Sequence, residues 1–158
     1  MLDTTKEIFI QSMFQILLAA IGSIGFALAF NADRRRVLVI GLGGGLSWAI
    51  YLICKYFSLS IFTASVISSG FVYLYSVIFS KVQKTPITVF FAPILIPLIP
   101  GGNLYYATYA LIDDNTESFF QNSKEMIHIA LGLVVGFLIC SILWKYIDTI
   151  ILKNSPKL

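Results

Sequence analysis

Residues 91–106 read Phe91-Ala92-Pro93-Ile94-Leu95-Ile96-Pro97-Leu98-Ile99-Pro100-Gly101-Gly102-Asn103-Leu104-Tyr105-Tyr106. Three prolines within eight positions, followed by two glycines and an asparagine, cannot form one regular helix. Each proline lacks an amide donor and clashes with the carbonyl four residues back, which costs about 3 kcal/mol in a helix interior. A single proline would be an ordinary kink, which membrane helices tolerate. This stretch therefore predicts a true helix break, with helix resuming near Asn103.

Apolar sequence surrounds the break along nearly the whole chain. Of the 158 residues, 58% are apolar and 12% are charged, and the mean hydropathy is +0.86. Soluble domains carry about 25% charged residues, so this chain is expected to expose its side chains to lipid. Five runs reach the ~20 residues that a helix needs to span a bilayer, and none alternates with the period of a strand. They cover about residues 8–30, 37–54, 59–79, 87–112 and 125–147. We expect an all-α polytopic membrane bundle, a single membrane domain over residues 1–158.

The basic residues predict how the bundle is oriented. With the N-terminus outside, eight lysines and arginines fall in cytoplasmic segments and three in outer ones. Because cytoplasmic loops carry an excess of Lys and Arg, we expect the N-terminus outside and the C-terminus in the cytoplasm. The N-terminal segment has no basic region and no cleavage site, so we expect a retained first helix rather than a removable signal. An inner or plasma membrane follows as the expected location.

Small residues predict where helices touch. Lipid supplies no hydrophobic drive for helix association, so close backbone approach must bring helices together. Gly41, Gly43, Gly44 and Gly45 crowd one helix, Gly132 and Gly136 form a GxxxG pair, and Ser65 and Ser69 repeat that spacing. These patterns occur in many bundles and do not identify one.

The broken fourth helix is the best candidate for a binding site. Irregular backbone at membrane depth survives only where protein or a water-filled cavity satisfies it. A half-helix that starts there presents free amides and a positive dipole end, which discontinuous helices use to bind anionic substrate groups. We expect the amides near Gly101, Gly102 and Asn103 to receive a substrate carboxylate. The predicted substrate-binding residues are Pro97, Pro100, Gly101, Gly102, Asn103, Tyr105, Thr108 and Tyr109. The alternative is a structural kink without a ligand.

Other chemistry has little support in the sequence. Glu125 and His128 share a helix face, but one histidine cannot make a metal site. Cys54 and Cys140 both fall within apolar runs, where they are expected to act as small apolar residues. There is no phosphate-binding loop, dinucleotide fingerprint or Ser-His-Asp pattern, and no basic stripe for nucleic acid. We expect no enzyme, no metal and no cofactor. If transport is proton-coupled, the candidate groups are Asp113, Asp114, Glu125, His128 or a carboxylate on a partner.

Two motifs resemble those of the threonine/serine exporter family. The first is Gly25-Phe26-Ala27-Leu28-Ala29-Phe30-Asn31, in which Gly25, Phe26, Phe30 and Asn31 carry the likeness. The second, more specific one is Ile96-Pro97-Leu98-Ile99-Pro100-Gly101. In length, helix count and motif order the chain is similar to the short, YjjB-type subunits, which resemble the second five-helix half of longer members. It departs from them in Gly102 and Asn103 after the motif and in an arginine-rich inner loop.

The resemblance implies a partner and a substrate class. Split members divide two halves between two proteins, and related pairs are linked to export of threonine and serine or of dicarboxylates such as succinate. A first half that starts inside ends outside, where this chain begins. Two units of opposite orientation suit an inverted-repeat transporter with its site where they meet. We therefore expect a larger membrane subunit that supplies the other half. The glycine-rich faces would also suit a copy of the same chain.

The sequence thus favours a secondary-transporter subunit that exports small carboxylate-bearing metabolites. A second reading is a scaffold or assembly subunit without its own substrate site. A membrane enzyme on lipid substrates is the weakest alternative, because no nucleophile, metal set or acid pair forms a cluster.

Overall fold

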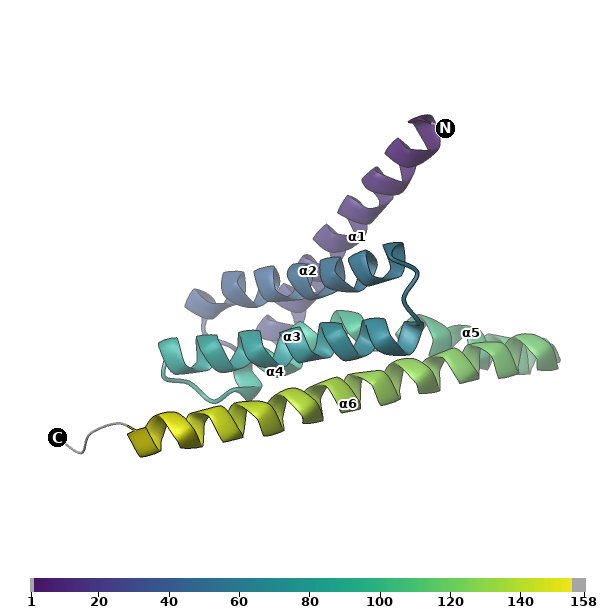
Figure 1. The fold of residues 1–158 in the computed structure, drawn as a ribbon. Coiled ribbons are helices and arrows are strands. Elements are labelled where there is room, and N and C mark those ends of the chain that lie inside the picture. Colours follow the sequence, from purple (N-terminus) through teal and green to yellow (C-terminus); the bar gives the residue numbers. More distant parts are fainter. Residues whose placement is uncertain (1, 155–158) are drawn as a thin grey trace.

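The computed structural model describes residues 2–154, and all its regular elements there are helical (Figure 1). The elements are α1 (Leu2–Ala29), α2 (Arg34–Tyr56), α3 (Ile61–Val82), α4 (Thr88–Leu95), the short 3-10 helix η1 (Ile96–Leu98), α5 (Gly101–Ile112) and α6 (Thr116–Asn154). Four of these helices are long and apolar enough to span a membrane. Thr88–Leu98 and Gly101–Ile112 form a bent pair that passes the same test together. The predicted polytopic helical bundle with a broken fourth helix is confirmed.

The last helix begins nine residues earlier than expected. We predicted a start near Glu125, whereas α6 begins at Thr116 and runs for 39 residues. Asn115 starts it, because its side-chain oxygen accepts a hydrogen bond from the Ser118 amide at 3.0 Å, a typical N-cap contact. Hydropathy registers only the apolar part of a helix. The polar segment 116–124 belongs to the same helix as the apolar part, and α5 packs against α6.

Short turns with a left-handed residue connect the helices. Asn31 has φ 56°, and the amides of Ala32 and Asn31 donate to the carbonyls of Ala27 and Leu28 at 2.9 and 3.0 Å. This is a Schellman motif, in which asparagine is one of the few residues that tolerates the left-handed position. Asp33 then caps α2 by accepting from the Arg35 amide. The last residue of the first family motif therefore ends a helix.

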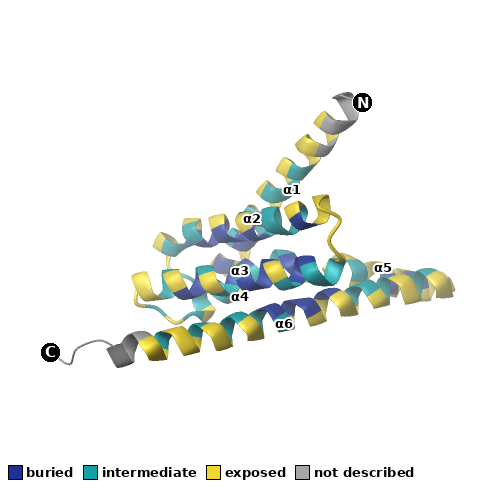
Figure 2. Cartoon of the chain, in the orientation of Figure 1, coloured by how far each residue is buried: buried dark blue, intermediate teal, exposed yellow. Residues whose placement is uncertain are grey.

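Two of the predicted small-residue motifs meet at one interface. A Cβ atom on Gly132 would lie 2.7 Å from the Phe62 carbonyl oxygen and 2.8 Å from Ser65. One on Gly136 would lie 2.1 Å from the Ser69 hydroxyl. The GxxxG pair of α6 therefore packs on the Ser65–Ser69 face of α3, with backbones close enough to exclude a side chain. Figure 2 shows the buried residues of α3 and α6 along the faces that meet.

The break divides the fourth span into two limbs with different surroundings. On the first limb Phe90, Ile94 and Leu98 lie one turn apart and are buried in the core cluster with Ile40 and Val72. Pro100, with φ −76° and ψ 54°, then forms an inverse γ-turn closed by the Gly101 amide, which donates to the Ile99 carbonyl at 2.7 Å. The limbs differ in direction by 47°. Helix resumes at Gly101 rather than near Asn103, and α5 packs mainly against α6.

Candidate functional site

The break opens a small cavity between α2, η1, α5 and α6. This break cavity has a volume of about 200 Å³. Its lining residues are Trp48, Tyr51, Pro97, Leu98, Ile99, Pro100, Gly102, Asn103 and Ile129. Four predicted binding residues, Pro97, Pro100, Gly102 and Asn103, are among them. Trp48 and Tyr51 stack on one another at 5.3 Å between ring centroids and supply the aromatic wall.

Two of the three expected amides are free at this cavity. The Gly101 amide is engaged in the γ-turn, so it does not match the expectation. The amides of Gly102 and Asn103 donate to no atom of residues 2–154. They are the first-turn donors of a 12-residue helix whose N-cap, Pro100, offers no side-chain oxygen. First-turn amides and the helix dipole together favour an anion at this place.

Tyr105, Thr108 and Tyr109 do not line the cavity, contrary to our expectation. Tyr105 and Tyr109 are 65% and 56% exposed, and the Thr108 hydroxyl donates back to the Leu104 carbonyl at 2.9 Å. The buried face of α5, with Ala107 and Ala110, is a different one. The spacing correctly placed the three residues together on α5, but it could not say in which direction they point.

Asn103 also connects the cavity to the last helix. Its side-chain amide donates to the Glu125 carboxylate at 3.0 Å. Both side chains are half-buried, and Glu125 lies close enough to Tyr51 to act on it electrostatically. The sequence placed Glu125 only on a helix face with His128, so it did not predict this contact.

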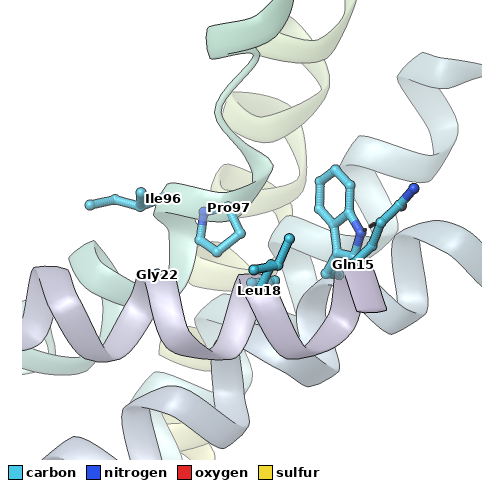
Figure 3. A pocket seen from close by; sticks show the side chains of 7 residues that line it. Gln15, Leu18, Gly22, Ile96 and Pro97 are labelled. Atoms are coloured by element: carbon cyan, nitrogen blue, oxygen red, sulfur yellow. Dashed lines mark hydrogen bonds between the residues drawn. The ribbon is translucent and has the colours of Figure 1, made fainter. Parts of the chain in front are cut away.

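A second hollow lies on the other side of Trp48 and Pro97. This α1 pocket, about 290 Å³, is lined by Gln15, Leu18, Ala19, Gly22, Trp48, Ile96 and Pro97. In Figure 3, Gln15, Leu18 and Gly22 lie along one helix, with Pro97 on the neighbouring segment. The Trp48 indole donates to the Gln15 side-chain oxygen at 3.2 Å. The signal that sequence reasoning missed is Gln15, a polar side chain within an otherwise apolar run.

The candidate coupling residues separate in space. Glu125 and His128 line a third hollow, here called the α3–α6 hollow, of about 360 Å³. The rest of its lining is Ser60, Ile61, Phe62, Gln121 and Lys124. Asp113 is exposed at the end of α5 and lines neither this hollow nor the break cavity. Among the described residues, no three acidic, histidine or cysteine side chains are placed to hold a metal ion.

The first family motif lies outside the cavities. Gly25 and Phe26 are exposed on α1, and Phe30 is exposed in the turn that follows it. The rings of Phe26 and Phe30 lie 6.0 Å apart between centroids. A Cβ on Gly25 would meet nothing within 4 Å. This part of α1 is therefore an open surface.

Together these features define a multi-pass helical membrane protein with a broken span and a cavity at the break. The family described as "Threonine/Serine exporter, ThrE" matches residues 15–143. The chain belongs to this threonine/serine exporter family, as its motifs indicated. No solved structure matches the chain.

Proposed function

We propose that this chain is one half of a two-part exporter of small carboxylate-bearing metabolites, and that a larger membrane subunit supplies the other half. Threonine and serine are the first substrates to test, and dicarboxylates such as succinate the second. The observation that carries the proposal is the pair of free amides, those of Gly102 and Asn103, at the break cavity of a protein in an exporter family. A substrate carboxylate would accept from these amides at the positive end of α5.

The distribution of glycines supports a second subunit. In seven of the eleven glycines an added Cβ would come within 3.3 Å of a neighbouring element. The other four would meet nothing within 4 Å: they are Gly22, Gly25, Gly101 and Gly102. A glycine inside a helix lowers the stability of that helix by about 1 kcal/mol relative to alanine. In this chain, most glycines lie where two elements pack closely. The open glycines of α1 and α5 are therefore the surface that we assign to the partner.

We propose an inner-membrane location with the N-terminus outside. Arg34, Arg35 and Arg36 begin α2, Lys81 lies in the last turn of α3, and Lys84 lies in the turn between α3 and α4. The antiparallel order of the helices puts these residues at the same end of the bundle. An excess of positive charge at one end is typical of the cytoplasmic side.

The decisive experiment is export from cells that lack their own exporter and are loaded with threonine, serine or succinate. The chain is expressed alone, with its genomic neighbour, and with a neighbour that is unrelated. Export only with the genomic neighbour would support the split transporter and identify its substrate. Robust export by this chain alone in proteoliposomes would contradict the need for a partner. Export that needs only residues of the neighbour for substrate binding would favour the scaffold reading.

A further inference from the structure

Three hollows follow one another through the molecule. The α1 pocket and the break cavity share Trp48 and Pro97 as lining residues. The break cavity ends at Asn103, which donates to Glu125, and Glu125 lines the α3–α6 hollow. A single hydrogen bond between two side chains thus lies where the break cavity and the α3–α6 hollow adjoin.

The α3–α6 hollow contains groups of both charges. Lys124 supplies a cation and Glu125 an anion, and Ser60 and Gln121 add neutral polar groups. The His128 Nδ1 atom lies 2.7 Å from the Lys124 carbonyl oxygen. A carbonyl only accepts, so Nδ1 carries the hydrogen and Nε2 remains available. A molecule with an ammonium and a carboxylate would find a partner for each group here.

Glu125 forms no ion pair within residues 2–154. Its hydrogen-bond partner is the neutral Asn103 amide. In the described part of the chain, the ion pair that forms is Lys81 with Asp148, far along α6. An ammonium attracts the carboxylate with a full unit charge as well as donating to it, whereas the Asn103 amide is a neutral donor. An incoming ammonium would therefore compete effectively with the Asn103 amide for the carboxylate.

We propose that the Asn103–Glu125 hydrogen bond is a gate between the break cavity and the α3–α6 hollow, and that a ligand ammonium opens it by binding Glu125. The inference rests on the proposed function, because it assumes that substrate occupies the break cavity. It adds a route to that function, from the break to the hollow at the start of α3. It also adds selectivity: a dicarboxylate brings no ammonium and is repelled by Glu125, so it would not open the gate.

The test measures access to the cavity rather than export. Leu98 lines the break cavity and is only 4% exposed, so Leu98→Cys serves as the reporter. Cys54 and Cys140 are free and are replaced by alanine. The rate of labelling by a membrane-impermeant thiol reagent is measured in whole cells and in inside-out vesicles. Comparing the two preparations determines the side of access separately from the gate.

Asn103→Asp is expected to accelerate labelling of the reporter at least about tenfold, because it replaces the donor with a second carboxylate and removes a hydrogen bond to a charged group. The reversed pair, Asn103→Asp with Glu125→Gln, restores one donor and one carboxylate and should return the rate to that of the parent. This double variant also controls for general disruption of the fold. Equal labelling of the single and double variants, or no acceleration from either side, would overturn the gate.

A second set of labelling measurements, with ligands added, tests whether an ammonium group opens the gate. Threonine or serine should accelerate labelling of the reporter, succinate should not, and Glu125→Gln should remove the effect of the amino acids. Acceleration by succinate, or amino-acid acceleration that survives Glu125→Gln, would contradict the proposed role of Glu125. Because no transport is measured, a failed gate remains distinguishable from a failed exporter: export without the predicted labelling pattern rejects only the gate.

Discussion

Gly136 on α6 lies so close to Val66 on α3 that an added Cβ would come within 2.2 Å of the Val66 carbonyl oxygen. Gly22 on α1 is in the opposite situation, with nothing within 4 Å of the same position. The same substitution at these two glycines therefore separates packing within the chain from packing against another subunit.

We predict that Gly136→Ala lowers the free energy of unfolding by about 1–3 kcal/mol, because the helices must move apart to admit the methyl group. Gly22→Ala should leave it unchanged or raise it by up to about 1 kcal/mol through helix propensity. Denaturation of the purified chain in detergent, followed by circular dichroism, measures both.

If a partner helix packs on the open face of α1, a larger residue there should impair export without unfolding the chain. We predict that Gly25→Leu inserts normally, yet loses association with the genomic neighbour in a co-purification assay. The matched control is Leu28→Ala on the same helix, which leaves the glycine in place. Full association of Gly25→Leu would exclude this face as the interface.

The amide of Gly102 is testable by a substitution that removes only the donor. Proline is tolerated in the first helical turn, and Gly101 before it has no Cβ to clash with the ring. We predict that Gly102→Pro reduces export, measured with the genomic neighbour, further than Gly102→Ala, which keeps the N–H. A lost hydrogen bond to a charged group is worth about 1.5–3 kcal/mol. Equal export by the two variants would show that this amide does not bind substrate.

The proposed topology makes its own prediction. In a chain with Cys54 and Cys140 replaced by alanine, Asp114→Cys should react with an impermeant thiol reagent in whole cells, and Lys84→Cys only in inside-out vesicles. Both residues are exposed in turns, so neither substitution disturbs packing. The reverse pattern would invert the orientation.

The ion pair between Lys81 and Asp148 should add little stability. The two side chains are 53% and 40% exposed, and exposed pairs contribute about 0.2–1 kcal/mol. We predict that Asp148→Asn shifts the unfolding midpoint in detergent only slightly, and less at high salt. Trp144, over whose ring the Lys81 ammonium lies at 4.8 Å, should matter more, so Trp144→Ala is the informative comparison.

Much of the fold could be predicted because its cause is local. Proline lacks a backbone donor whatever its tertiary surroundings. The three prolines therefore allowed the break at residues 96–100 to be predicted from the sequence. The contact between Asn103 and Glu125 depends instead on a turn that was misplaced. Asn103 lies eleven residues before Asp114, and Glu125 lies eleven residues after it. A helical hairpin whose turn is centred on Asp114 therefore places Asn103 and Glu125 opposite each other. A correct start for α6 would have revealed the pair.

The direction in which the side chains of α5 face could not be predicted, for a different reason. Periodicity indicates which residues of α5 share a face, but the face turned towards α6 is chosen by Ala107 and Ala110, whose small size admits close packing. The aromatic residues Tyr105 and Tyr109 were therefore assigned to the cavity, although they are exposed and do not line it. Trp48 likewise lines two hollows, which its place in an apolar run did not indicate.

The proline positions also constrain how the protein can move. In a continuous helix, the amides of residues 97 and 100 would donate to the carbonyls of Pro93 and Ile96. Residues 97 and 100 are both proline, however, and have no N–H. Neither ligand binding nor protonation can therefore join the two limbs into one regular helix. The position of the joint between the limbs is therefore fixed by the sequence, and the first limb is anchored in the core through Phe90 and Ile94.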